Sequence, residues 1–377
     1  MEIIILWIVI SVVLVSVFMW LYICRYFQQR YFERNYHPQW LKEDEIGNFP
    51  KNYEIKNIPW ISYKKAYCQP ATIQMVAYKN GIKADRDYIN FLMGHTYGAV
   101  YFGKQLSIMP TTDPEAGAEV AAPYLGLKRN YLVTNDLKLF IKAVKFYLSK
   151  DYPIRIALNV AILSGKLGFS PHSELLIGYN DEYFFYFETG NEDRWSENKR
   201  RLSIDEQTLT KAVNSLSKTF NLPWKFQLTT YEKYKKEKDL RKIWKRNGEL
   251  LVGNKWGPVK SGSFAIRKFS SDLEKLSSKI TDWQSIEYLL EWFSYTRFDN
   301  VKFLKEHFMG NKKVEEASQN IEKAAKCYEE SLKILKKDKK INEIITLLYK
   351  AASLEKKAGE VFISKDKELD EGISDTT

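Results

Sequence analysis

The sequence predicts an α+β protein with one apolar helix in front of its body and a helical region behind it. Three observations predict this class. Residues 3–24 form an uncharged apolar run, residues 52–232 mix the helical period of 3.6 with the strand period of two, and residues 263–365 keep the helical period. Because helical patterns come before strand patterns in the middle segment, we expect an α+β domain there.

The N-terminal apolar run has the length and composition of a membrane-spanning helix. Its 22 residues contain no charged side chain, and at a rise of ~1.5 Å per residue they cover roughly 33 Å. Trp7 and Trp20 lie toward its ends, where aromatic rings prefer the membrane interface. A cleaved signal peptide usually has a positive charge before its apolar part, whereas Glu2 stands there in this chain. We therefore expect an uncleaved anchor whose residues 3–24 lie in the lipid bilayer.

Positive charges follow the apolar run and none precede it. Arg25, Arg30 and Arg34 come directly after it, so the positive-inside rule predicts a single-pass protein of the cell membrane with its body in the cytoplasm. The whole chain has a net charge of +11, which favours acidic partners such as lipid headgroups or an acidic protein. The charge is spread thinly and no nucleic-acid recognition motif is present, so nucleic acid is not an expected partner.

Composition divides the chain into six segments. They are the anchor at 1–24, a polar and aromatic neck at 25–51, the mixed body at 52–232, a basic linker at 233–262, the helical region at 263–365 and an acidic tail at 366–377. The tail is expected to be disordered. Within the linker region, the basic segment 231–248 predicts a solvated helix.

The body and the helical region contain several predictable elements. One amphipathic helix is predicted at 136–151 from the three- and four-residue spacing of Leu137, Phe140, Ile141, Val144 and Leu148. Short runs rich in β-branched and aromatic residues predict strands at 153–163, 173–179 and 183–189. Two long amphipathic patterns predict a helical hairpin from 314–335 and 341–362.

Cysteine usage points to one residue. The three cysteines form neither a disulfide framework nor a zinc pattern, and the glycines form no phosphate or dinucleotide motif, so we expect no metal and no cofactor. Cys68 directly precedes an apolar helical run in which Pro70 fits the first turn. Unpaired N–H groups at a helix start stabilise a thiolate, which makes Cys68 a candidate nucleophile. The alternative is a small apolar residue buried at a helix start.

The predicted strand hairpin supplies a candidate base. If residues 180–182 form a three-residue loop, Tyr179 faces Tyr183 across the hairpin. Glu174 then faces Glu188, because the same register continues along both strands.

His172, which begins the first strand, would share its face with both carboxylates. A carboxylate fixes the tautomer of a histidine and stabilises the imidazolium, which in turn stabilises a thiolate. Two alternatives stand beside this hypothesis. In the first alternative, His172 is a core residue whose hydrogen bonds are satisfied. In the second, a register shift of one residue turns Glu188 to the other face of the sheet.

Several motifs resemble known families. A cysteine at a helix start, followed much later by a strand-borne histidine, resembles the papain-like thiol enzymes. The segment HSELLIGYNDEYFFYFETG resembles the histidine and acid pattern of peptidases that process double-glycine leader peptides. The butirosin biosynthesis protein H family is a closer match, because the chain resembles it in YCQPATIQMVAYKNG, INFLMGHTYGAVYF and HSELLIGYND and in its C-terminal helices.

This resemblance implies a papain-like cysteine-enzyme domain followed by an all-helical domain. It implies Cys68 as the nucleophile, His172 as general base and acid, and Glu188 as the group that orients the histidine. The acid of these enzymes is usually Asp, and Glu174 is the alternative acid in this chain.

The oxyanion hole is the incomplete part of the resemblance. Papain-like peptidases often carry a glutamine several residues before the cysteine, and Ser62 stands six residues before it here. Gln69 follows the cysteine instead. Ser62 and Gln69 are therefore both candidates for the donors that stabilise an oxyanion.

The resemblance also implies a function. The namesake of the family moves an aminoacyl group from an acyl carrier protein thioester to an amine of an aminoglycoside. A membrane-anchored, thiol-dependent acyltransferase that forms an acyl-cysteine is therefore expected, with an acidic acyl carrier protein or a peptide as its partner. A cysteine peptidase or amidase of the leader-processing type is one alternative, and a non-catalytic membrane-anchored scaffold is another.

Overall fold

The computed structural model describes residues 2–63, 67–102, 106–190, 201–255 and 259–364. The predicted tail at 366–377 lies outside these residues. The helices are α1 (Glu2–Tyr36), α2 (Cys68–Lys79), α3 (Arg86–Met93), α4 (Pro114–Tyr124), α5 (Leu137–Ser149), α6 (Val160–Leu163), α7 (Glu206–Thr219), α8 (Arg241–Val252), α9 (Gly262–Leu276), α10 (Trp283–His307), α11 (Lys312–Lys337) and α12 (Ile341–Ile363). The strands are β1 (Gln39–Trp40), β2 (Tyr53–Glu54), β3 (Val100–Tyr101), β4 (Ile108–Met109), β5 (Leu127–Thr134), β6 (Ile154–Asn159), β7 (Pro171–Tyr179), β8 (Tyr183–Phe187), β9 (Arg201–Asp205), β10 (Phe226–Lys233) and β11 (Lys260–Ser261).

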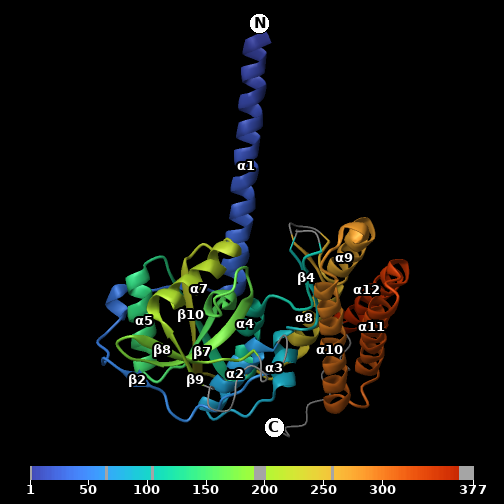
Figure 1. Cartoon of the computed structure of the whole chain (residues 1–377). Coiled ribbons are helices and arrows are strands. Elements are labelled where there is room, and N and C mark those ends of the chain that lie inside the picture. Colours follow the sequence, from blue (N-terminus) through green and yellow to red (C-terminus); the bar gives the residue numbers. More distant parts are fainter. Residues whose placement is uncertain (1, 64–66, 103–105, 191–200, 256–258, 365–377) are drawn as a thin grey trace.

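The chain is a mixed α+β structure, as the sequence predicts. One apolar helix projects from the body, a sheet-bearing half follows it, and α9–α12 form a helical half beside the sheet (Figure 1). The main sheet has the strand order β1-β5-β10-β6-β7-β8-β9, with β2 pairing with β7. Its pairs are antiparallel except for β1 with β5.

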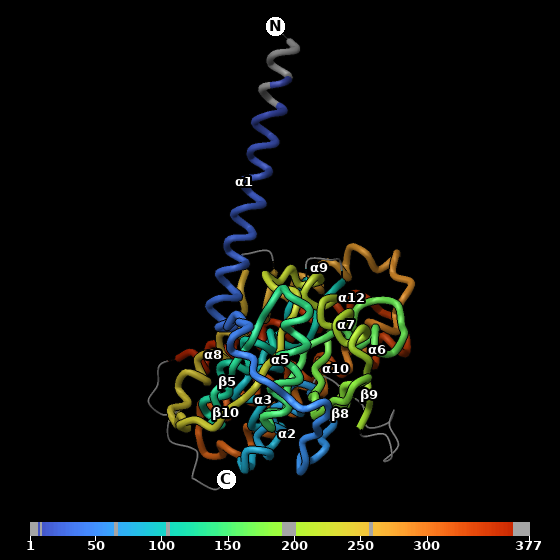
Figure 2. The backbone as a smooth tube through the Cα atoms, turned by 90° about the vertical axis from the view of Figure 1, so that its left-hand side faces the viewer, coloured from blue at the N-terminus to red at the C-terminus, as the bar shows by residue number. Residues whose placement is uncertain are grey.

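Both faces of this sheet are covered, and the two faces belong to different cores. Leu176 of β7 lies in a core with residues of α5 and α7, and Figure 2 shows α5 in front of this face. Leu175 and Ile177, which alternate with it, lie in a core with α2 that also takes in residues of α8, α10, α11 and α12. The sheet-bearing half and the helical half therefore share one core, and this core holds α2 in place.

Several local predictions need correction. The strand predicted at 153–163 ends at Asn159, whose side chain accepts the backbone N–H of Ala161 and begins the short helix α6. Strands β5 and β10 were missed, and β5 comes before α5, so helices and strands interleave. Leu137, predicted on the buried stripe of α5, is 44% exposed because it lies in the first turn of that helix.

The C-terminal hairpin prediction is confirmed, whereas the solvated basic helix is not. Helices α11 and α12 pack together, and each buries an apolar stripe: Val314, Ala317, Ile321, Ala324, Tyr328 and Leu335 on α11, and Ile344, Leu348, Ala351 and Ala358 on α12. Helix α8, which begins inside the basic segment 231–248 and ends at Val252, buries Ile243, Trp244 and Leu251. A Cβ on its Gly248 would lie 2.6 Å from the carbonyl oxygen of Gly359, so α8 packs closely against α12 and is part of the core.

The length and composition of helix α1 are sufficient for it to cross a membrane. A signal sequence near the N-terminus would have the same length and composition. Its apolar window has a mean hydropathy of 1.9 and is not buried by the rest of the chain. The helix continues to Tyr36, so the first part of the predicted neck is helical. Phe32 and Tyr36 pack against Tyr131 and Trp224, which fixes the base of α1 on the sheet-bearing half.

Candidate active site

Cys68 is the first residue of α2. Tyr67 is the N-cap residue, and Pro70 lies in the first turn, where it lacks only an N–H that would have no partner in the helix. The backbone N–H groups of Gln69 and Ser173 donate to the Cys68 sulfur. The helix start that the sequence predicts is therefore present, and the thiol lies beside β7.

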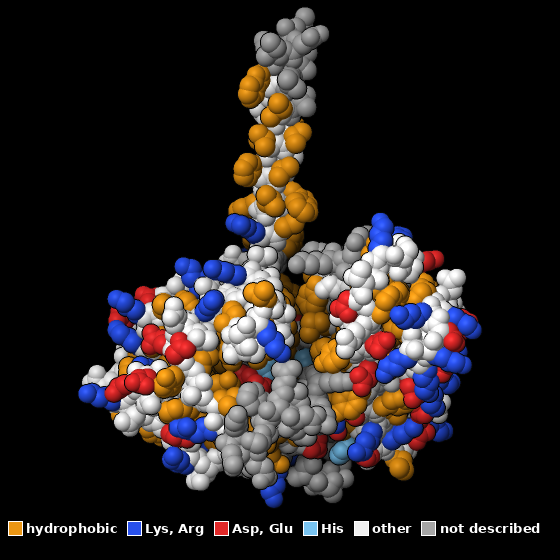
Figure 3. Space-filling view, in the orientation of Figure 1, with side chains coloured by type: hydrophobic (Ala, Val, Ile, Leu, Met, Phe, Trp, Pro, Cys, Tyr) orange, Lys and Arg blue, Asp and Glu red, His pale blue; other side chains and the backbone are white. Residues whose placement is uncertain are grey.

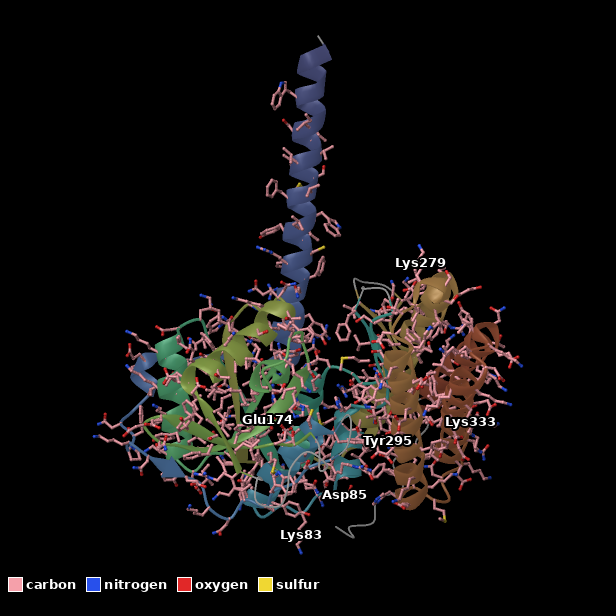
Figure 4. The ribbon with its side chains drawn as sticks, in the orientation of Figure 1. Lys83, Asp85, Glu174, Lys279, Tyr295 and Lys333 are labelled. Atoms are coloured by element: carbon pink, nitrogen blue, oxygen red, sulfur yellow. The ribbon has the colours of Figure 1, made fainter. Side chains whose placement is uncertain are left out.

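The helical half holds this helix start in place. The Tyr67 hydroxyl donates to Oδ2 of Asp299 on α10 at 2.8 Å. Arg86 lies over the Tyr67 ring at 4.4 Å and forms an ion pair of 3.1 Å with Asp299. Arg86 also donates to the hydroxyl of Tyr295, which Figure 4 labels on α10. These contacts connect the position of Cys68 to a helix more than two hundred residues later in the chain.

The strand that carries His172 pairs with β8 in an irregular register. Next to the turn, Tyr179 pairs with Phe184, so the predicted pairing of Tyr179 with Tyr183 is wrong. The physical reason is the Asn180 side chain, which accepts the backbone N–H groups of Glu182 and Tyr183 and closes a tighter turn.

A bulge restores the predicted alignment at the other end of the hairpin. The register shifts between Leu176 and Gly178, and Leu176 then pairs with Tyr186. Continued by two residues, this register aligns Glu174 with Glu188. Both carboxyl groups therefore lie next to the strand start that carries the histidine.

The imidazole of His172 lies between the thiol and the two carboxyl groups. Its Nε2 is 2.8 Å from Oε1 of Glu188 and 3.3 Å from Oε1 of Glu174. The Thr189 hydroxyl is 3.5 Å from the same nitrogen. The ring also interacts with the Cys68 thiol, because its charge and hydrogen bonding lower the pKa of that thiol.

This arrangement favours a charged sulfur and a charged ring. Burial raises the pKa of the Cys68 thiol, but the charge and hydrogen bond of His172 and two backbone N–H groups outweigh it, and the net pKa is lowered. Burial likewise lowers the pKa of His172, but the acid pair of Glu174 and Glu188, which shares one negative charge beside Nε2, and the Cys68 sulfur raise it well above its ordinary value. A thiolate and an imidazolium are therefore the stable pair over the pH range between these two values.

The two carboxyl groups differ in charge. Burial raises the pKa of Glu188, but hydrogen bonds from His172, Glu174 and the Gly190 N–H lower it to about 2, so Glu188 is a carboxylate. Glu174 is fully buried, and burial together with the Glu188 charge raises its pKa well above the ordinary value. Neither oxygen of Glu174 has a well-formed hydrogen bond among the described residues, and the nearest donor is Nε2 of His172 at 3.3 Å, so a proton on Glu174 that is donated to Glu188 lowers the cost of burying this group. Glu188 therefore orients the ring, and Glu174, which Figure 4 labels within the sheet-bearing half, is the neutral acid beside it.

The two oxyanion candidates have different surroundings. Gln69 is buried, and its side-chain oxygen accepts a 2.5 Å hydrogen bond from Arg155 of β6. Arg155 also donates to Glu115 of α4 and to Thr229 of β10. The Ser62 hydroxyl is buried and has no hydrogen-bond partner among the described residues. Gln69 is thus held in one orientation by a buried network, whereas no described contact fixes the Ser62 hydroxyl.

Three residues near the histidine were not predicted from the sequence. The Trp60 indole donates to the Glu188 carbonyl oxygen at 2.9 Å, and the Thr189 hydroxyl donates to the Ser173 carbonyl oxygen at 2.5 Å. A Cβ on Gly190 would lie 2.5 Å from Cε1 of His172, so only glycine leaves room for the ring. A glycine directly after the predicted strand, two residues after its acid, was the one available signal.

His172, Glu174 and Glu188 also form the described cluster that could hold a metal ion, with their ligand atoms within 4.8 Å of one another. Imidazole and carboxylate are suitable ligands for zinc. The short contact between His172 and Glu188 is equally the distance of a charge-assisted hydrogen bond. The same groups can therefore bind either a proton or a metal ion at Nε2.

Figure 3 shows the face on which the two halves meet, and it is hollowed between the sheet-bearing half and α9 and α10 below the base of α1. Apolar side chains line the upper part of this hollow. Comparison with known proteins adds no relative: no family model matches the chain, and no curated protein matches it either. A function therefore has to be inferred from the chemistry of the described side chains.

Proposed function

We propose that the chain is a thiol enzyme of acyl transfer, anchored in the cell membrane, with a papain-like body of the butirosin biosynthesis protein H type. One observation carries the proposal. His172 interacts with the Cys68 thiol at the start of a helix, and Nε2 of its ring lies 2.8 Å from the Glu188 carboxylate. This combination of nucleophile, base and orienting acid is what covalent catalysis by cysteine requires.

The proposed reaction has two halves. The Cys68 thiolate attacks the carbonyl carbon of a thioester, ester or amide, a C–S bond forms, and the bond to the leaving group breaks. The His172 imidazolium gives its proton to the leaving group. The neutral imidazole then takes a proton from an amine or a water molecule as that group attacks the acyl-cysteine, and the thiolate is released.

Location and charge suggest the partners. Helix α1 supports a bilayer anchor, and the arginines after it favour a cytoplasmic body. A net charge of +11 suits an acidic acyl carrier protein as the donor, or an acidic peptide substrate. The acceptor depends on whether the site binds an amine and excludes water.

Intact-protein mass spectrometry tests the proposal. The full chain in detergent micelles is mixed with a small acyl thioester and quenched after short times. An added mass equal to the acyl group, absent from Cys68→Ala and retained in Cys327→Ala, is the expected result. Cys327 is the matched control because it is buried in the helical half. The acyltransferase proposal would be contradicted if the wild-type chain formed no adduct under conditions in which iodoacetamide still labels Cys68.

A peptidase of the leader-processing type is the second candidate. The β7–β8 hairpin, with its histidine and its acid, favours it equally. Adding an amine separates the two functions. An amine acceptor that removes the acyl group faster than water does indicates transfer, whereas cleavage of a double-glycine peptide with no effect of the amine indicates a peptidase. A chain that binds a partner but forms no adduct with thioester or peptide would be a scaffold.

A further inference from the structure

Three aromatic side chains from distant segments form an exposed cluster. The Phe220 ring lies 5.5 Å from the ring of Phe169 and 6.2 Å from the ring of Phe102, measured between centroids. Phe102 and Phe169 are 36% and 38% exposed, and Leu167, two residues before Phe169, is fully exposed. Contiguous apolar side chains on a surface usually mark an interaction site.

This cluster is continuous with the base of α1. The side-chain amide of Gln28 on α1 donates to the carbonyl oxygen of Phe220 at 2.9 Å. Gln28 comes four residues after Cys24, the end of the apolar run, which corresponds to ~6 Å along a helix. The headgroup layer on one side of a bilayer is roughly 5–7 Å thick. If residues 3–24 cross the hydrocarbon, the backbone of Phe220 lies at the level of the headgroups.

The side chains around the cluster carry positive charge. Lys166 lies beside Leu167, and Lys218 and Lys225 flank the segment of Phe220, with all three lysines exposed. Lys218 and Lys225 also line a shallow surface pocket next to Trp224, the residue on which α1 packs. Figure 3 shows Lys and Arg side chains on the edge of the body around the base of α1. Anionic headgroups attract lysines at such a surface.

We propose that this surface lies in the headgroup layer of an anionic bilayer. We call it the collar, and define it as Phe102, Lys166, Leu167, Phe169, Lys218, Phe220 and Lys225. Aromatic rings and lysines are the side chains that prefer this layer, the first for its mixed polarity and the second for its charge. The proposal rests on the membrane anchor of the proposed function.

The collar also lies close to the candidate site along the chain. Phe169 comes three residues before His172, and the Ser170 N–H between them donates to the side chain of Asn159 at 2.9 Å. The collar therefore lies at the membrane-facing end of the segment that leads into β7 and His172. The collar thus favours a membrane-associated acyl donor or acceptor.

Lipid quenching tests the collar on the full chain. A Cys24→Ser, Cys68→Ser background receives one new cysteine, labelled with a fluorophore, and is placed in vesicles of phosphatidylcholine and phosphatidylglycerol. A fraction of the lipid carries a nitroxide, near the headgroup in the sample that probes position 167 and on the acyl chain in the sample that probes position 13, and position 309 is measured in both samples. The labelled positions are Leu167→Cys in the collar, Val13→Cys in the anchor and Met309→Cys as the matched control. Met309 is an exposed apolar residue two positions after the end of α10, and Figure 1 shows α10 in the helical half, apart from α1.

The expected result is quenching at positions 13 and 167 that exceeds quenching at 309 several-fold. Quenching at 13 but not at 167 would overturn the collar and leave the anchor standing. An absence of quenching at 13 would overturn the anchor and the collar together. Replacing phosphatidylglycerol by phosphatidylcholine should weaken quenching at 167 but not at 13, and an unchanged signal at 167 would overturn the role of anionic lipid.

Discussion

The buried guanidinium of Arg155 donates a 2.5 Å hydrogen bond to the side-chain oxygen of Gln69, the residue that follows Cys68. Glu115 accepts hydrogen bonds from both Arg155 and Arg129. Burial raises the pKa of its carboxyl group, but the two arginines outweigh this effect and the net pKa is lowered. The Gln69 carboxamide is therefore held with its oxygen toward Arg155 and its N–H₂ group away from it. This orientation makes Gln69 the better supported of the two oxyanion candidates.

Gln69→Ala is expected to slow formation of the acyl-cysteine about a hundredfold, because one donor to the developing oxyanion is lost. Alkylation of Cys68 by iodoacetamide forms no oxyanion, so its rate should change little. Intact mass spectrometry measures both rates on the same samples. Gln74→Ala, one turn later in α2, is the matched control and should retain acylation. Equal losses of acylation and alkylation would instead indicate that Gln69 only supports the helix start.

His172→Gln is expected to reduce Cys68 alkylation at pH 7 by about tenfold or more. The variant loses the charge that lowers the thiol pKa and keeps the burial that raises it. The rate should therefore recover as the pH rises above the ordinary pKa of a thiol, and the two pH profiles should converge. Cys327, whose pKa is raised by burial, is the internal reference for reagent access. Identical profiles for the wild type and the variant would contradict the thiolate–imidazolium pair.

Glu174→Gln is expected to raise the free energy of unfolding at pH 8 by about 1–2 kcal/mol. An acid whose pKa is raised by folding destabilises the fold at pH values above its pKa in the unfolded chain, and the neutral amide lacks this cost. The gain should fade as the pH falls below about 4, where the acid is neutral in both states. Urea unfolding followed by tryptophan fluorescence in one detergent measures it from pH 4 to 8.

Glu188→Gln is expected to have the opposite sign. The pKa of Glu188 is lowered to about 2, so its charge stabilises the fold above its ordinary pKa, and this contribution is lost as the pH falls toward 2. At pH 8 the substitution should cost on the order of 2–3 kcal/mol and slow Cys68 alkylation as well. If Glu174→Gln were the more damaging substitution, Glu174 would be the acid that orients His172.

Gly190→Ala is expected to slow Cys68 alkylation about tenfold while leaving the fold intact. The new Cβ would lie 2.5 Å from Cε1 and 2.8 Å from Nε2 of His172, so the ring or the Glu188 carboxylate has to move. Gly47→Ala, whose Cβ would meet only one ring carbon of Phe146 at 3.3 Å, is the control. An alkylation rate equal to that of the control would show that the position of the ring does not govern thiol reactivity.

The local parts of the candidate site could be predicted from the sequence. A cysteine before a proline-containing apolar run gives a helix start, and both signals lie within a few residues of each other. The alignment of Glu174 with Glu188 was also expected, but through a turn register that is wrong by one residue. The bulge between Leu176 and Gly178 cancels this shift, so the correct alignment depended on a feature that no periodicity reveals.

The long-range parts could not be predicted. Arg155 is one charged residue inside an apolar strand run, and its partners lie on α4 and β10, far apart in the chain. The contact of Tyr67 with Asp299 joins the two halves of the molecule in the same way. The segment 231–248 predicts a solvated helix because lysines and arginines dominate its composition, whereas three apolar residues of α8, Ile243, Trp244 and Leu251, decide where that helix packs.

The aromatic packing at the base of α1 has a mechanical consequence. Phe32 and Tyr36 belong to the same uninterrupted helix as the apolar run, and their contacts with Tyr131 and Trp224 leave no loop between that run and the body. In the proposed membrane-anchored state the helix is a rigid spacer and not a flexible linker. Cys68 would then stay at one fixed height above the bilayer surface. It would meet membrane-bound substrates by lateral diffusion in two dimensions.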